Sequence, residues 1–109
     1  MSLFTGRVAL VTGGARGLGR DYASFFADDG AKVAIADIDG AGAETAAASL
    51  AAGDRSALGV RMDITDEDSV DHGIGVIVAE LGSIDILVNN AGLWGDLQLT
   101  SVLTTDIDY

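Results

Sequence analysis

Short apolar runs alternate with helical segments along the chain, and this alternation constrains the fold more than any other feature. Four runs rich in β-branched and aliphatic residues predict buried strands over residues 7–12, 32–37, 57–62 and 84–88. Segments with helical periodicity separate these runs. Strands that alternate with helices form a parallel sheet covered on both faces, and right-handed crossovers then give a doubly wound α/β sheet with strand order 3-2-1-4.

Each of the helical segments carries its own signals. In the first, large apolar residues at i, i+4, i+7 and i+8 predict the face toward the core: Leu18, Tyr22, Phe25 and Phe26. The second spans residues 41–52. The third follows a sequence that resembles a capping box, with Thr65 as the cap and Asp68 as the returning acid. Gly73 and Gly75 inside the third helix weaken it by about 1 kcal/mol each relative to alanine.

The composition indicates one acidic domain and narrows its partners. The 109 residues carry 6 basic and 17 acidic side chains, a net charge of −11, which repels phosphate backbones and anionic lipids and argues against nucleic-acid and membrane partners. No apolar run approaches the ~18 residues of a membrane span. Residues 1–6 do not resemble a signal peptide, and the sequence has no cysteine. We expect a single cytoplasmic domain over residues 1–109, without a metal site.

A glycine-rich segment follows the first predicted strand and opens the first predicted helix. From Thr12 to Gly19 it reads T-G-G-A-R-G-L-G. Gly13 would permit a tight turn, Gly17 would let the backbone approach a pyrophosphate, and Gly19 would let helix and strand pack closely. The free N–H groups and the dipole of the helix N-terminus would then stabilise an anion. The alternative is a plain strand-to-helix turn rich in glycine.

Asp37 ends the second predicted strand, 18 residues after Gly19. A dinucleotide site has an acid at about this spacing, where it accepts hydrogen bonds from the hydroxyls of the adenosine ribose. Because a carboxylate there would repel a 2′-phosphate, Asp37 favours NAD over NADP. Arg16 argues the other way, since a basic residue in the glycine loop could meet that phosphate, but Asp37 is expected to touch the ribose directly. The alternative for Asp37 is a turn aspartate.

Polar residues also follow the third and fourth predicted strands. Asp63 could accept a hydrogen bond from the adenine amino group, with Ile38 and Ile64 packing on the ring, although a turn that leads into a helix explains Asp63 nearly as well. After the fourth strand comes N-N-A-G, from Asn89 to Gly92. Small residues there would leave room for ribose and nicotinamide, and the asparagine side chains could tie neighbouring strand ends together. On its own this segment would be interpreted as a turn.

Together, these motifs resemble the classical short-chain dehydrogenase/reductase family. T-G-G-A-R-G-L-G, Asp37, Asp63 and N-N-A-G carry the resemblance, which covers essentially the whole chain. It implies a single Rossmann domain, a nicotinamide cofactor, hydride transfer to or from an alcohol or carbonyl substrate, and commonly a homo-oligomer. It adds Leu18 as a backbone contact near the nicotinamide-side phosphate. The candidate cofactor-binding residues are then Gly13, Arg16, Gly17, Leu18, Gly19, Asp37, Ile38, Asp63, Ile64, Asn89, Ala91 and Gly92.

The catalytic serine, tyrosine and lysine that the resemblance implies have no match in these residues. The only lysine is Lys32, Tyr22 has Phe26 where the family has its lysine, and Tyr109 is the last residue. Because family members are longer, we expect a fragment of a longer NAD-dependent enzyme, inactive alone, whose fourth strand is left as an apolar edge. The alternatives are a non-catalytic NAD-binding module and a half-enzyme completed by another chain.

Overall fold

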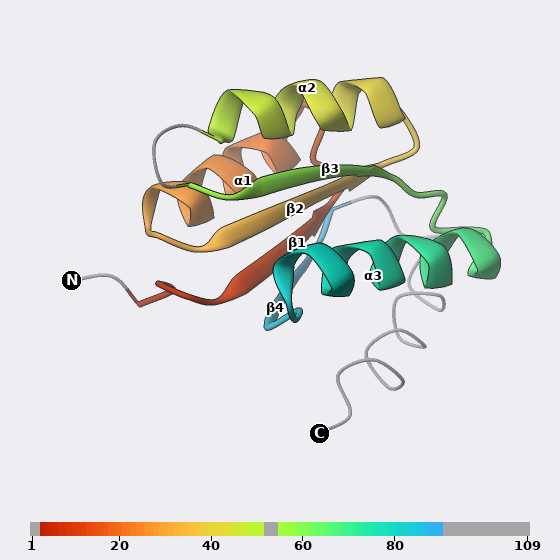
Figure 1. Ribbon diagram of the computed structural model, residues 1–109. Helices are drawn as coiled ribbons and strands as arrows, with labels where there is room; N and C mark the ends of the chain where they lie inside the picture. The colour runs from red at the N-terminus through yellow and green to blue at the C-terminus, as the bar shows by residue number, and fades with distance from the viewer. Residues whose placement is uncertain (1–2, 52–54, 91–109) are drawn as a thin grey trace.

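The structure, a computed structural model, describes residues 3–51 and 55–90 (Figure 1). Within these residues the strands are β1 (Val8–Thr12), β2 (Lys32–Asp37), β3 (Ala57–Arg61) and β4 (Ile86–Asn89). The helices are α1 (Gly17–Asp28), α2 (Gly40–Leu50) and α3 (Glu67–Leu81). Strands and helices alternate as the sequence predicts.

The strands form one parallel sheet in the order β3-β2-β1-β4, which confirms the predicted topology. Val11 of β1 lies in register with Ile35 of β2 on one side and with Val88 of β4 on the other. One residue further along, Thr12 pairs with Asn89. The carboxyl ends of these strands therefore share one edge of the sheet, where ligands of doubly wound sheets bind.

Helices cover both faces of the sheet: α1 and α2 lie on one face and α3 on the other (Figure 1). Strand side chains alternate between the faces, so that Ala9 and Val11 join the core under α1 and α2 while Leu10 joins the core under α3. Across the described ranges, no helix is long and apolar enough to cross a membrane.

The prediction for the buried face of α1 is wrong at three of its four residues. Leu18 and Phe25 are 58% and 59% exposed, and Tyr22 is 38% exposed. The face that packs on the sheet instead consists of Gly19, Ala23, Phe26 and Ala27. Small residues at i, i+4 and i+8 let the helix axis approach the strands closely, so residue size misled the sequence interpretation.

The predicted cap of α3 is also wrong, by one residue. Asp66 is the N-cap, and its carboxylate accepts a hydrogen bond from the N–H of Asp68 at 3.1 Å. The Thr65 hydroxyl instead donates to Oδ1 of Asp63 at 2.6 Å, and the N–H of Thr65 donates to the same oxygen at 3.0 Å. Thr65 therefore belongs to the loop that ends β3, and the helix begins with Glu67.

Candidate functional site

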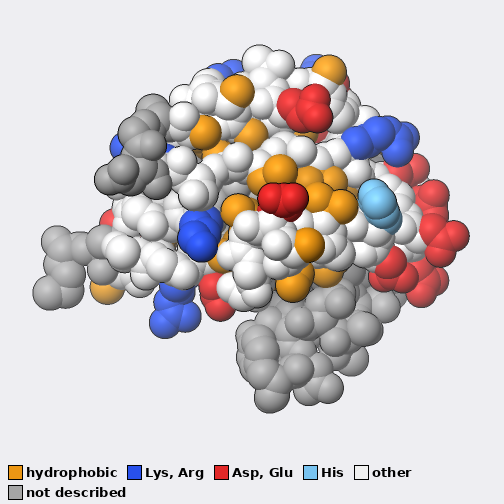
Figure 2. Space-filling model, in the orientation of Figure 1, with side chains coloured by type: hydrophobic (Ala, Val, Ile, Leu, Met, Phe, Trp, Pro, Cys, Tyr) orange, Lys and Arg blue, Asp and Glu red, His pale blue; other side chains and the backbone are white. Residues whose placement is uncertain are grey.

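A cavity of about 430 Å³ opens at the carboxyl edge of the sheet, where the loops after β1, β2 and β3 meet. Its lining residues are Gly13, Arg16, Ala36, Asp37, Ile38, Asp39, Met62, Asp63, Ile64, Thr65 and Asn90. Figure 2 shows Asp and Glu side chains gathered at the end of the molecule where α3 begins, near this edge. Glu67 and Asp68 in the first turn of α3 are two of these acids.

The glycine loop adopts a backbone that its glycines permit. Gly13 and Gly17 have φ values of 64° and 62°, in the left-handed region that side chains disfavour. A Cβ on Gly19 would overlap the carbonyl oxygen of Gly13 and the side-chain amide of Asn90. Gly19 therefore permits a close approach of α1 to the loop and to the end of β4.

The N-terminus of α1 is left open for an anion. Arg16 is the N-cap residue, in extended backbone, and its side chain makes no capping hydrogen bond. The first amides of a helix have no intrahelical acceptor, and the helix dipole adds partial positive charge there. A Cβ placed on Gly17 would meet no atom within 4 Å, so the space beside this first turn is empty.

Thr12 joins β1 to β4 at the site. It is fully buried, and its hydroxyl oxygen accepts a hydrogen bond from the N–H of Asn90 at 3.1 Å. The same hydroxyl lies 3.4 Å from the carbonyl oxygen of Val88 and 3.4 Å from the side-chain oxygen of Asn89. The Asn90 side chain donates to the carbonyl of Gly13 at 3.3 Å. The asparagines thus tie the neighbouring strand ends together.

The Asp37 carboxylate links the glycine loop to the β2–α2 turn through hydrogen bonds. One carboxylate oxygen accepts a hydrogen bond from the N–H of Ala15 at 3.2 Å, and the other accepts one from the N–H of Asp39 at 3.0 Å. A carboxylate has about four acceptor positions. Asp37 therefore keeps acceptor capacity toward the cavity that it lines.

Asp63 is held as an anion at the end of β3. Its Oδ1 accepts hydrogen bonds from the hydroxyl of Thr65 at 2.6 Å and from the N–H of the same residue at 3.0 Å. These bonds, the hydroxyl first, hold the pKa of Asp63 below its ordinary value, because they stabilise the ionised form. The N–H of Asp63 donates to the Ser69 hydroxyl at 2.9 Å, which fixes the loop against α3.

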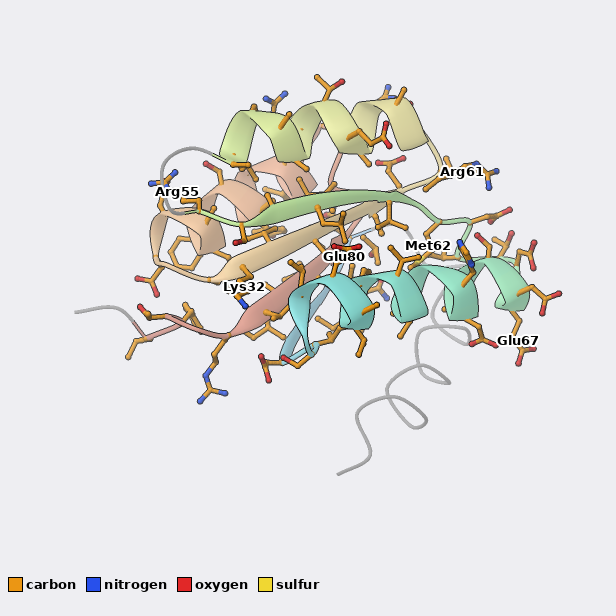
Figure 3. The ribbon with its side chains drawn as sticks, viewed as in Figure 1. Lys32, Arg55, Arg61, Met62, Glu67 and Glu80 are labelled. Atoms are coloured by element: carbon orange, nitrogen blue, oxygen red, sulfur yellow. The ribbon has the colours of Figure 1, made fainter. Side chains whose placement is uncertain are left out.

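Apolar side chains form the walls of the cavity. Ile64 and Met62 are buried, whereas Ile38 is 59% exposed at the cavity. Met62 lies between the end of β3 and α3 (Figure 3), and a Cβ on Gly73 would come within 2.5 Å of its terminal methyl group. Gly73, which has no role in the sequence interpretation, thus leaves room for a side chain that lines the cavity.

Arg16 and Asp39, which both line the cavity, form an ion pair. The guanidinium of Arg16 lies 3.1 Å from Oδ2 of Asp39, and the two side chains are 79% and 42% exposed. Oδ1 of Asp39 accepts a hydrogen bond from the N–H of Gly42 at 2.9 Å and so caps α2. The Asp39 carboxylate therefore both caps α2 and pairs with Arg16.

The structure brings together half of the predicted site residues and adds several that sequence reasoning missed. Gly13, Arg16, Asp37, Ile38, Asp63 and Ile64 all line the cavity. Gly17, Leu18 and Gly19 form the first turn of α1, and Asn89 lies at the end of β4. Ala91 and Gly92 lie outside the described residues. The residues not predicted are Ala36, Asp39, Met62, Thr65 and Asn90, of which Asn90 carried a signal in N-N-A-G.

Comparison with known proteins identifies the family. The family model described as short chain dehydrogenase matches residues 7–108. The chain therefore belongs to the short-chain dehydrogenase family, a family of oxidoreductases that use a nicotinamide cofactor, NAD or NADP.

Several curated relatives carry specific names. The chain is 48% identical to galactitol 2-dehydrogenase of Agrobacterium fabrum, over 81% of this chain and 33% of that protein. It is 44% identical to sorbitol dehydrogenase of Cereibacter sphaeroides, over 94% of this chain and 39% of that protein. It is 48% identical to D-threitol dehydrogenase of Mycolicibacterium smegmatis, over 81% and 34%. The matches thus span less than half the length of these relatives.

Proposed function

We propose that this chain binds NAD in the cavity at the carboxyl edge of its sheet and supplies the cofactor-binding half of an NAD-dependent oxidoreductase. The observation that carries the proposal is the convergence on one cavity of an open helix N-terminus, three carboxylates and an apolar wall. A bound nicotinamide dinucleotide supplies the group that accepts or donates a hydride. The residues of this chain hold and orient it.

The first turn of α1 suits the pyrophosphate. Its amides lack side-chain caps, and the position beside Gly17 is open, so a phosphate group can approach the backbone. Gly19 keeps the loop and the helix close together, which fixes the direction of these N–H groups. Leu18, between them, offers its backbone N–H to the same anion.

The loops after β2 and β3 suit the adenosine. Asp37 retains acceptor capacity for the ribose hydroxyls, and Asp63, kept ionised by Thr65, is an acceptor for the adenine amino group. Ile38 and Ile64 supply apolar surface for the ring. An exposed isoleucine at a cavity loses contact with water when a flat ring covers it, which favours binding.

The charges favour NAD over NADP. Asp37 lines the cavity where the ribose is expected, and a 2′-phosphate would bring further negative charge beside it. Like charges held within a few ångströms disfavour each other at a partly buried site. The site therefore prefers a free 2′-hydroxyl.

The names of the relatives suggest the substrate class of the complete enzyme. Galactitol, sorbitol and threitol are sugar alcohols, and three relatives are dehydrogenases named for them. We extend the proposal to a secondary hydroxyl of a polyol, which is oxidised to the ketone as its carbon gives a hydride to the oxidised nicotinamide and its oxygen releases a proton. Polyols are the first substrates to test with a longer form of the protein.

Titration of the 109-residue chain with NAD⁺ and NADP⁺ tests the binding proposal. Two-dimensional amide NMR reports both that the chain is folded and which amides shift. We expect NAD⁺ to shift amides of the glycine loop and of the loops after β2 and β3, with weaker binding of NADP⁺. A folded chain that binds neither dinucleotide contradicts the proposal, and tighter binding of NADP⁺ contradicts the assigned preference.

A further inference from the structure

The ion pair between Arg16 and Asp39 has no role in the binding scheme above. Arg16 is the one basic side chain among the cavity-lining residues that the structure describes. It stands where the glycine loop meets the β2–α2 turn, close to the carboxylate of Asp37, which accepts from the neighbouring Ala15 N–H at 3.2 Å. A cation there would be the natural partner of a 2′-phosphate on the ribose.

Asp39 neutralises this cation in the free chain. Its Oδ2 lies 3.1 Å from a terminal guanidinium nitrogen of Arg16. The opposite charge at this distance cancels much of the positive potential that Arg16 would present to an anion. A 2′-phosphate would have to compete with Asp39 for the guanidinium, in addition to meeting the charge of Asp37.

Two features of α2 hold Asp39 in this position. Its Oδ1 accepts the N–H of Gly42 at 2.9 Å, which fixes the carboxylate at the start of the helix. A Cβ on Gly42 would overlap that carboxylate and would lie 3.3 Å from the Cβ of Ala15. The absence of a side chain at residue 42 therefore lets Asp39 reach across to the glycine loop.

We propose that Asp39 is a positioning residue for cofactor choice, which engages the guanidinium of Arg16 and so denies it to a 2′-phosphate. The inference rests on the proposed function and extends it, because Asp37 is no longer the sole determinant of the preference for NAD. Arg16, which taken alone favours NADP, becomes part of an NAD-selective arrangement through its pairing with Asp39.

A double-mutant cycle distinguishes an effect of Asp39 through Arg16 from direct electrostatic repulsion between Asp39 and the 2′-phosphate. The variants are Asp39→Asn, Arg16→Gln and the two combined, and asparagine keeps an oxygen that can cap α2. Calorimetry measures the Kd of adenosine 2′,5′-bisphosphate, with AMP as the ligand that lacks the 2′-phosphate. These probes report on the ribose end without requiring the nicotinamide half of the site.

We expect Asp39→Asn to tighten binding of adenosine 2′,5′-bisphosphate about three- to tenfold when Arg16 is present, since an exposed ion pair is weak and its release frees one charge-assisted contact. In the Arg16→Gln background the same substitution should change this Kd less than about twofold. The Kd of AMP is measured for the same variants, and the change in the ratio of the two Kd values isolates the effect on the 2′-phosphate. Gly42→Ala, which displaces the Asp39 carboxylate, should act in the same direction as Asp39→Asn.

Each outcome has a distinct meaning. Equal tightening in both backgrounds shows that Asp39 acts by direct repulsion and overturns the inference, as does the absence of any tightening in Asp39→Asn. In either case, continued binding of AMP and NAD⁺ leaves the proposed function standing. A folded chain that binds none of these ligands overturns the proposed function and the inference together.

Discussion

At the residue scale, the carboxylate of Asp37 has a structural role, and we propose that it also recognises the ribose of the cofactor. Both of its oxygens accept backbone N–H groups, one from the glycine loop and one from the β2–α2 turn. It therefore organises the two loops between which the ribose is expected, and it places a negative charge there. Asparagine keeps one of the two carboxylate oxygens, so Asp37→Asn removes the negative charge together with one of the two backbone hydrogen bonds.

Asp37→Asn should narrow the preference for NAD⁺ over NADP⁺ by about tenfold, because one charge at ~6 Å in a partly solvated site is worth roughly 1–2 kcal/mol. The measurement is the ratio of the two Kd values. Glu80→Gln is the matched control, since it removes one negative charge from the last turn of α3 (Figure 3). An unchanged ratio in Asp37→Asn, or an equal change in Glu80→Gln, would contradict the assignment of Asp37.

Thr65→Val should raise the pKa of Asp63 toward the ordinary carboxyl value, because it removes the hydroxyl bond that contributes most to the shift. NMR titration of the Asp63 carboxyl carbon measures this directly. The lowered pKa in the folded chain stabilises it above the ordinary carboxyl pKa, and this contribution is lost as pH falls through the folded-state pKa.

Thr45→Val is the control for that titration. The Thr45 hydroxyl donates to the carbonyl of Ala41 at 2.9 Å on the exposed surface of α2. The pKa of Asp63 should be the same in this variant as in the parent chain. A pKa of Asp63 that does not move in Thr65→Val would show that the hydroxyl is not its cause.

Part of the site could be predicted from the sequence because the ends of the strands can be recognised in it. Asp37 and Asp63 each follow an apolar run, so the topology places both at one edge of the sheet. Asp39 and Met62 gave no such signal. The pairing of Asp39 with Arg16 spans 23 residues of sequence, and the direction of the Met62 side chain depends on the space left by Gly73, neither of which residue spacing reveals.

At the scale of elements, helical periodicity alone does not identify the buried face of α1. The large apolar residues and the small ones both recur with helical spacing, on different faces, and the small face is the one that is buried. The face with small residues is buried because α1 packs on β1 and also approaches the glycine loop closely at Gly19. A strand-adjacent helix whose first turn we propose to bind an anion needs close approach more than it needs large side chains.

Gly75→Ala should stabilise the chain by about 0.5–1 kcal/mol, because alanine restricts the unfolded state and favours helix. A Cβ at residue 75 meets no atom within 4 Å, and the residue lies inside α3. Gly73→Ala is the matched comparison: it brings the same helical gain but displaces the methyl group of Met62. Urea unfolding of both variants should show the larger gain for Gly75→Ala, and equal gains would contradict the packing role of Gly73.

At the scale of the whole molecule, the described residues line the part of the sheet edge where we propose that the adenosine half of the cofactor binds. The cavity opens between the loops after β1, β2 and β3, and Asn90 of N-N-A-G also lines it. The matched segments cover 33% to 43% of the longer relatives. We therefore expect this chain to hold the adenine half of the cofactor more tightly than the nicotinamide half.

Thermal unfolding of the 109-residue chain in the presence of ligands tests whether the adenosine half of the cofactor dominates binding. A ligand that binds only the folded state at 100 times its Kd adds about 2.7 kcal/mol of stability, which for a domain of this size raises Tm by roughly 10–20 °C. AMP and NAD⁺ should each produce a rise that grows with concentration, whereas nicotinamide mononucleotide should produce little, because it lacks the adenosine that Asp37, Asp63 and the isoleucines are placed to contact. A larger rise with nicotinamide mononucleotide than with AMP would mean that binding is governed by the opposite end of the cofactor, and the roles assigned to the loops after β2 and β3 would fail.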